Sequence, residues 1–193
     1  MKVYETGNIH NVVVMGHGGC GKTTLVEAIA YQTGITARMG KVTDGNTISD
    51  YDKEEQKRQF SISTSVVPVE FEDIKINFLD TPGYFDFVGE VEEACHAAGA
   101  AVIVINGKSG VEVGTLKAWE LCEKYKLPRL FFVTGMDDDQ ASYRKIVLEL
   151  NDRFGRKVAP FHVPIRENEK FVGFVNVVKM KGRRFINDTS EYE

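Results

Sequence analysis

The chain has 193 residues, which suits one domain with a small appendage, and its 42% hydrophobic and 27% charged residues match a globular fold. A formal net charge of -4 excludes broad electrostatic binding to nucleic acid or to a membrane, although it is compatible with a local basic patch. The longest apolar stretch, residues 97–105, is too short to span a bilayer. Cys20, Cys95 and Cys122 have no metal-site or redox spacing, and with no signal-peptide pattern they predict a reducing cytoplasm.

The N-terminal part begins with a predicted strand and helix. Residues 10–15, HNVVVM, are almost wholly apolar and predict a strand buried on both faces, as in a parallel sheet. Residues 23–32 predict a helix that ends before Gly34. Its apolar face comprises Leu25, Val26, Ile29 and Ala30. Residues 35–60 are polar and irregular, and the charged run DKEEQKR near their end is interpreted as a solvated surface.

The middle of the chain again alternates between strands and helices. Residues 61–71 and 74–80 flank a Glu-Asp pair and predict a hairpin, in which Pro68 places the first strand toward an edge. Residues 100–105 predict a buried strand. Residues 110–126 predict a helix, and its inward face comprises Leu116, Leu121, Cys122 and Tyr125.

The C-terminal part adds a strand over residues 129–134 and a helix over residues 140–154, which Gly155 follows. The apolar stripe of this helix comprises Tyr143, Ile146, Val147, Leu150 and Phe154. Alternation of strands and helices along the whole chain predicts a three-layer α/β fold with a mostly parallel sheet.

The loop after the first strand carries a phosphate-binding pattern. Residues 16–24, GHGGCGKTT, fit G-x-x-x-x-G-K-[ST] between a predicted strand and a predicted helix. Backbone N–H groups of such a loop face anionic oxygens, and the helix N-terminus adds a positive dipole end. We expect Lys22 to face solvent and to reach the β- and γ-phosphates of a triphosphate, and the Thr23 hydroxyl to bind Mg²⁺. The predicted phosphate-binding residues are Gly16, His17, Gly18, Gly19, Cys20, Gly21, Lys22, Thr23 and Thr24.

Two residues of this loop are interpreted as having no chemistry of their own, namely His17 and Cys20. The nearby helix N-terminus leaves open a lowered pKa for the Cys20 thiol.

A second pattern ends the strand 74–80, where Asp80 is followed by Thr-Pro-Gly. A carboxylate beside a phosphate loop holds Mg²⁺ through water, and Gly83 offers a backbone N–H to a γ-phosphate. On its own, the Asp-Thr-Pro-Gly sequence fits a tight turn as well as it fits a metal and phosphate site. Its occurrence together with the phosphate loop favours the functional interpretation.

Together these segments resemble the G domain of elongation factor G and its relatives among the translational GTPases. The likeness covers residues 16–34, 80–120, 126–137 and 163–185. It is closest to the divergent paralogues of that factor. The resemblance implies a P-loop NTPase fold with a core in residues 1–157 and the start of an inserted subdomain in residues 158–193. It also implies that the last strand and helix of the domain are lacking from this chain.

The resemblance further implies a domain that binds GTP or GDP with Mg²⁺, hydrolyses GTP and acts on the ribosome within a longer protein. It implies neither membrane association nor sequence-specific nucleic-acid binding by this segment. Asp137 stands where the family pattern Asn-Lys-x-Asp has the aspartate that accepts hydrogen bonds from guanine, and Thr134 and Gly135 replace the Asn-Lys pair. The alternative is that Asp137 and its neighbours through Asp139 cap the following helix.

Other departures from the family pattern bear on catalysis. Tyr84 replaces the histidine that orients the attacking water, and a phenol does not become a cation near neutral pH as imidazole does. Gly18 and Gly19 replace an apolar residue and an aspartate in the phosphate loop. Ser61 replaces the threonine that closes over Mg²⁺ and keeps its hydroxyl.

The predicted catalytic residues are Lys22, Gly83 and Tyr84. The predicted Mg²⁺ ligands are Thr23, Ser61 and Asp80. The predicted nucleotide site adds Asp80, Gly83, Thr134 and Asp137 to the phosphate loop. Three functions remain open: a translational GTPase domain, a nucleotide-gated binding module with little or no hydrolysis, and a P-loop ATPase or kinase. The Asp-Thr-Pro-Gly segment and the long polar segment before it disfavour the third.

Overall fold

The computed structural model describes residues 2–168, 170–186 and 189–192. The chain divides into two compact units, the first formed by Met1–Ile105 and Glu112–Thr134 and the second by Asn106–Val111 and Gly135–Glu193. Each unit is built on a β-sheet of its own, and the phosphate loop, residues 16–24, belongs to the first unit.

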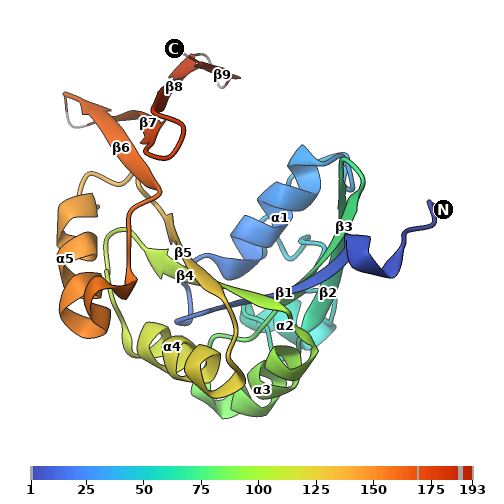
Figure 1. Ribbon diagram of the computed structural model, residues 1–193. Coiled ribbons are helices and arrows are strands. Elements are labelled where there is room, and N and C mark those ends of the chain that lie inside the picture. The colour runs from blue at the N-terminus through green and yellow to red at the C-terminus, as the bar shows by residue number, and fades with distance from the viewer. Residues whose placement is uncertain (1, 169, 187–188, 193) are drawn as a thin grey trace. The chain divides into compact units, whose positions relative to one another are not determined.

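The first sheet has the strand order β2-β3-β1-β4-β5 (Figure 1). Its strands are β1 (Ile9–Gly16), β2 (Ser65–Phe71), β3 (Ile74–Asp80), β4 (Ala100–Asn106) and β5 (Arg129–Thr134). β1 pairs in parallel with β3 and with β4, whereas β2 and β3 form an antiparallel hairpin. This hairpin and the mostly parallel sheet were both predicted and are confirmed. Pro68 lies in β2, an edge strand, where its missing N–H disturbs one side of the ladder only.

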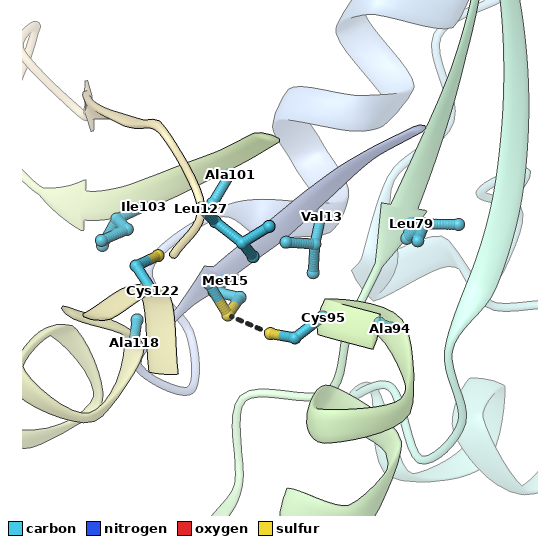
Figure 2. Packing of buried hydrophobic residues seen from close by; sticks show 10 residues of the cluster. All are labelled: Val13, Met15, Leu79, Ala94, Cys95, Ala101, Ile103, Ala118, Cys122 and Leu127. Carbon is cyan, nitrogen blue, oxygen red and sulfur yellow. Dashed lines mark hydrogen bonds between the residues drawn. The ribbon is translucent and has the colours of Figure 1, made fainter. Parts of the chain in front are cut away.

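Helices cover both faces of the first sheet. α1 (Lys22–Gln32) packs on one face, and α3 (Val88–Ala97) and α4 (Val113–Tyr125) pack on the other (Figure 1). Side chains alternate along β1, so Val14 is buried with the α1 residues, and Val13 and Met15 are buried with α3 and α4. Figure 2 shows the cluster under α3 and α4, where the Cys95 sulfur lies 3.5 Å from the Met15 sulfur. The predicted three-layer architecture is therefore confirmed.

The start and the inward face of α4 differ from the prediction. The helix begins at Val113 rather than at residue 110, where Gly110 has a φ of +80° that a right-handed helix cannot contain. Leu116 does not belong to the buried cluster. The residues of α4 that pack in or against this cluster are Ala118, Trp119, Leu121, Cys122 and Tyr125. The same unit also contains the short 3-10 helices η1 (Thr6–Asn8), η2 (Val42–Asp44) and η3 (Phe85–Phe87).

The charged run near residue 55 is not merely a solvated surface. It forms α2 (Lys53–Arg58), which begins after Asp52, whose carboxylate accepts the Glu54 N–H at 2.7 Å. Glu55 is buried and accepts the N–H groups of Ile62 at 2.8 Å and Ser63 at 3.1 Å. Because this carboxylate satisfies backbone donors from a following segment, it lies inside, and the solvated interpretation is wrong for Glu55.

The second unit contains α5 (Tyr143–Phe154) and a four-stranded antiparallel sheet in the order β6-β7-β8-β9. Its strands are β6 (His162–Glu167), β7 (Lys170–Asn176), β8 (Lys181–Ile186) and β9 (Thr189–Tyr192), and η4 (Gly155–Lys157) follows α5. α5 begins later than residue 140, because Ser142 is its N-cap and accepts the Lys145 N–H at 3.3 Å. The aspartates before it therefore do not cap the helix. A domain boundary between residues 157 and 158 stays a prediction.

None of the helices in the described part of the chain has the length and apolar character that crossing a membrane requires.

Candidate nucleotide-binding site

The phosphate loop leaves the end of β1 and leads directly into α1, which begins at Lys22. Its backbone turns through positive φ at Gly19 (+76°) and at Gly21 (+95°), a conformation that glycine adopts without strain. The first N–H groups of an α-helix have no acceptor within the helix. Together with the positive end of the helix dipole, they make the start of α1 a site for an anion.

The Lys22 side chain lies within this loop. Its ammonium donates to the carbonyl oxygens of His17 at 2.9 Å and Gly16 at 3.3 Å, and only 6% of the residue is exposed. The expectation that Lys22 faces solvent is therefore wrong, because the loop's own carbonyls hold the ammonium inward. Since an ammonium has three N–H donors, these bonds leave one donor for a phosphate oxygen.

The Cys20 side chain points into the core and not toward the mouth of the loop. It is buried in the cluster that also contains Val14 and Val26. Burial raises the pKa of the Cys20 thiol and outweighs the nearby Lys22 charge, so the lowered pKa that the helix N-terminus left open is wrong. His17 Nε2 lies 3.6 Å from a carboxylate oxygen of Glu112, which is the residue before α4.

The Asp-Thr-Pro-Gly segment, residues 80–83, returns the chain to the phosphate loop. β3 is the parallel neighbour of β1, so the carboxyl ends of both strands meet at one edge of the sheet. The Thr81 hydroxyl donates to the Val14 carbonyl at 2.7 Å and fixes the segment there. A Cβ on Gly83 would lie 2.8 Å from the Gly18 Cα and would collide with the Lys22 ammonium. Only glycine therefore fits at position 83 in this arrangement.

Side-chain oxygens gather where β3, the start of α1 and the segment before β2 meet. Thr23 Oγ1 lies 3.3 Å from Ser61 Oγ, and Ser61 Oγ donates to Asp50 Oδ1 at 2.7 Å. Ser49 Oγ donates to Asp80 Oδ2 at 2.8 Å. The second carboxylate oxygens of Asp50 and Asp80 are buried and have no hydrogen-bond partner within the described part of the chain. Buried carboxylate oxygens in this situation call for a cation or a proton.

The electrostatics of this cluster test whether Mg²⁺ fits. Burial raises the pKa of Asp80 to about 6 and also raises the pKa of Asp50, because the hydroxyl bonds and the Lys22 charge only partly offset the loss of water. Two carboxylates and the hydroxyls of Thr23 and Ser61 form a hard oxygen set of the kind that Mg²⁺ prefers. The residues therefore fit a magnesium ion.

The sequence-predicted ligands Thr23, Ser61 and Asp80 lie together in this cluster, and Asp50 joins them. Sequence reasoning did not single out Asp50, because it lies in the polar segment before β2 with no motif around it. Two features of the sequence point to Asp50. It lies upstream of Ser61 in the same segment, and its carboxylate suits the predicted metal.

Aromatic side chains border the cavity beside the phosphate loop. The cavity has a volume of about 210 Å³ and is lined by Lys22, Thr23, Asp50, Ser61, Gly83 and Tyr84, among others. The ring centroids of Phe60 and Tyr84 are 4.7 Å apart, with an angle of 57° between the planes. Tyr84 is 47% exposed, and a Cβ on Gly18 would lie 3.3 Å from the Cζ atom of its ring. The structure thus brings the three predicted catalytic residues, Lys22, Gly83 and Tyr84, to one cavity.

The predicted base-reading residues fall in different units. Thr134 ends β5 in the first unit, and its hydroxyl donates to the Cys20 carbonyl at 2.7 Å, so it braces the phosphate loop. Asp137 belongs to the second unit, in a turn where Gly135 has a φ of +62° and Arg166 donates to the Met136 carbonyl at 2.8 Å. A contact of Thr134 or Asp137 with a base stays a prediction.

The loop, the lysine within it and the oxygen cluster beside it define the nucleotide-binding domain of a P-loop NTPase. More narrowly, the chain belongs to the family described as the elongation factor Tu GTP binding domain, whose sequence model matches residues 7–187. This match confirms the resemblance to the translational GTPases, which was inferred from the sequence motifs.

This chain is similar in sequence to known translation factors and similar in structure to a protein of known crystal structure. Over 158 residues it is 39% identical to an elongation factor G-like protein of Mycobacterium tuberculosis, a match that covers 82% of this chain and 22% of that protein. Over 186 residues it is 36% identical to elongation factor G of Chlamydia caviae, which covers 96% of this chain and 27% of that protein. A crystal structure of a Thermus thermophilus protein superposes with a TM-score of 0.91 at 37% identity, over 96% of this chain and 28% of that one. The chain thus spans about a quarter of the length of these relatives.

Proposed function

We propose that this GTP-binding domain hydrolyses GTP with Mg²⁺ as part of an elongation factor G-like translation factor, and that the whole protein couples this reaction to the ribosome. One observation carries the proposal. Beside a helix N-terminus lie the Lys22 ammonium, the Gly83 backbone and those carboxylate oxygens of Asp50 and Asp80 that have no hydrogen-bond partner in the described part of the chain. Cationic and N–H donors next to a hard oxygen set suit a triphosphate and its magnesium ion together.

In this proposal the N–H groups at the start of α1 and the remaining N–H donor of Lys22 bind the phosphates. Thr23, Ser61 and Asp80, with Asp50, would hold Mg²⁺, which when bound neutralises charge on the phosphate oxygens. The backbone N–H of Gly83 is the donor for the γ-phosphate, because no side chain at position 83 separates it from Lys22. The Tyr84 phenol is the group that would orient the attacking water.

For the base, we propose that the Asp137 carboxylate accepts from guanine N1–H and the 2-amino group, donors that adenine does not present together. The guanine nucleotide and, through the whole protein, the ribosome are the proposed partners. The cytoplasm, where bacterial translation takes place, is the proposed location.

A second function is a nucleotide-gated module that changes shape with little hydrolysis. The observation that favours it is Tyr84, which packs against Phe60 at the position where the family pattern has a histidine. The third alternative, an ATPase or kinase, loses its support because the chain belongs to a GTP-binding family.

The experiment that tests the proposal titrates the full-length protein with GTP, GDP and ATP by calorimetry, with Mg²⁺ and with a chelator. We expect GTP to bind more tightly than ATP and only with Mg²⁺ at full affinity. Turnover of GTP with and without ribosomes then separates the two functions. Stimulation by ribosomes supports the GTPase, whereas tight binding without stimulated turnover supports the gated module. Equal binding of ATP and GTP would contradict both.

A further inference from the structure

The last residue of β4, Asn106, has a side-chain amide whose orientation is fixed by the loop that follows it. Its Oδ1 atom accepts the backbone N–H groups of Lys108 at 3.0 Å and Ser109 at 3.2 Å. Since an amide nitrogen cannot accept these bonds, the assignment of its oxygen and nitrogen follows from the network. The Nδ2 atom makes no hydrogen bond within the described part of the chain. Both of its N–H donors are therefore available to a ligand.

Gly135 leaves open space beside this nitrogen. A Cβ on Gly135 would lie 3.7 Å from Asn106 Nδ2, and apart from the chain neighbours no other heavy atom of the described residues lies within 4 Å of that Cβ. The Gly135 carbonyl accepts the Asp138 N–H at 3.2 Å, so the turn that carries Asp137 starts at the same glycine. The available amide donors thus lie beside the turn whose carboxylate, in the proposed function, accepts from guanine.

The order of the strands indicates which part of a nucleotide faces the end of β4. This strand lies between β1, which leads into the phosphate loop, and β5, which leads into the turn with Asp137 (Figure 1). The Thr134 hydroxyl donates to the Cys20 carbonyl at 2.7 Å and lies 3.3 Å from the Ile105 carbonyl oxygen, so the ends of β4 and β5 meet at the phosphate loop. In a nucleotide the ribose joins the phosphates to the base. The end of β4 is the corresponding middle position of the sheet edge.

We infer that the Asn106 carboxamide binds the ribose of the nucleotide, with an Nδ2 N–H group that donates to the ring oxygen of the sugar. The inference rests on the proposed function in placing the phosphates at the loop and the base at Asp137. The ring oxygen can only accept a hydrogen bond, whereas the ribose hydroxyls both donate and accept, so the ring oxygen is the sugar atom that requires a donor. Gly135, where the family pattern has a lysine, leaves the amide uncovered on this side.

The experiment combines Asn106→Asp in the full-length protein with a change in the sugar. The aspartate keeps an oxygen for the N–H groups of Lys108 and Ser109 and removes the amide donors. Calorimetry compares GDP with its carbocyclic analogue, in which CH₂ replaces the ring oxygen. The added charge acts on the phosphates of both ligands, so the ratio of the two losses isolates the ring oxygen.

We expect Asn106→Asp to weaken GDP by a factor at least about three times the factor for the carbocyclic analogue, since a neutral hydrogen bond corresponds to roughly 2- to 10-fold in affinity. Equal factors for the two ligands, or parent-like affinity for GDP, overturn the inference. Asn151→Asp is the matched control, because it makes the same chemical change at an exposed position of α5 and should change neither affinity. If Asn106→Asp does not fold in circular dichroism, Asn106→Ser takes its place, because a serine hydroxyl also accepts nearby backbone N–H groups and is too short to reach the sugar.

The choice of nucleotide separates this inference from the proposed function. Tight binding of GDP without a difference between the two sugars overturns the inference alone. A parent that binds ADP and not GDP contradicts the proposed function. The same comparison with ADP and its carbocyclic analogue then decides the role of Asn106, because both nucleotides contain the ribose. A parent that binds neither nucleotide overturns both.

Discussion

Ser49 donates its hydroxyl hydrogen bond to Asp80 at 2.8 Å and thereby joins the polar segment before β2 to the end of β3. Ser49 is itself held from β2, where the Ser65 hydroxyl donates to the Ser49 carbonyl at 2.6 Å. Asp80 therefore has a fixed neighbour on one carboxylate oxygen and, in the described part of the chain, no hydrogen-bond partner on the other. A carboxylate buried in this way can bind a cation, and without a cation its charge destabilises the folded state.

The first prediction concerns the stability of the metal-free protein. The pKa of Asp80 is raised from 3.8 to about 6, so the folded state binds a proton more tightly than the unfolded state. The Asp80 contribution to stability is thus fully present below about pH 4 and is lost as the pH rises through 6. We expect Asp80→Asn to be more stable than the parent at pH 7.5 in the presence of a chelator, by at most about 3 kcal/mol, and to lose this advantage near pH 4.

Urea denaturation at both pH values measures this difference. The control is Asp73→Asn, because Asp73 is exposed and pairs with Lys2, so its replacement should not raise stability at pH 7.5. Calorimetry should show the opposite effect on function, with Mg²⁺ no longer increasing nucleotide affinity in Asp80→Asn. An Asp80→Asn protein that is less stable than the parent at pH 7.5 without metal would show that the buried charge is compensated.

The second prediction concerns Lys22. We expect Lys22→Ala to weaken GTP binding by roughly 10- to 150-fold, because the charge-assisted bond from its ammonium to a phosphate contributes about 1.5–3 kcal/mol. The same substitution removes the bonds to Gly16 and His17 that hold the loop. Calorimetry measures the affinity, circular dichroism checks the fold, and Lys117→Ala on the exposed side of α4 is the control. Parent-like affinity in Lys22→Ala would place the phosphates elsewhere.

The elements and the phosphate loop could be predicted because their signals are local. β1 is an unbroken apolar run, and the spacing of Gly16, Gly21, Lys22 and Thr23 is fixed by the loop's own geometry. The direction in which Lys22 points could not be predicted, since it depends on carbonyls that the folded loop presents to its own side chain. The direction of the pKa shift of the Cys20 thiol was left open for a related reason. Its position near a helix start is visible in the sequence, whereas its burial is a property of the packed core.

The polar segment before β2 was the least predictable part. Its buried carboxylates, Glu55 and Asp50, have partners elsewhere in the sequence, such as Ile62 and Ser61. Charged residues are mostly exposed, so composition favours a solvated face, and only tertiary contacts reverse that expectation. The cluster around Asp80 shows the same limit. The sequence could name three of its members, and the fold was needed to add the fourth.

The third prediction concerns the anchor of this segment on α1. Glu27 is buried, with 1% of the residue exposed, and its carboxylate accepts the N–H groups of Gly40 and Ile48, both at 2.7 Å. In Glu27→Gln the amide N–H₂ faces one of these donors, so we expect a loss of about 2–3 kcal/mol of stability. Amide hydrogen exchange at Gly40 and Ile48 should accelerate, while Gln32→Ala at the exposed end of α1 should not change it. Unaltered exchange in Glu27→Gln would mean that other contacts hold the segment.

The last prediction separates two roles for Thr134. If this residue braces the phosphate loop through its 2.7 Å bond to the Cys20 carbonyl, its loss affects every nucleotide alike. If it reads the base, its loss changes the preference for GTP over ATP. We expect Thr134→Val, which keeps the side-chain shape and removes the hydroxyl, to weaken GTP, GDP and ATP by the same factor of roughly 2 to 10, the equivalent of one neutral hydrogen bond. Calorimetry with the three nucleotides measures the factors, and Asp137→Ala is the comparison, since its proposed role predicts a loss for GTP and GDP only. A selective loss for the guanine nucleotides in Thr134→Val would assign Thr134 to the base. Other contacts would then have to hold the phosphate loop, among them the packing of the Cys20 side chain beside Gly16, where a Cβ on Gly16 would lie 2.9 Å from the Cys20 sulfur.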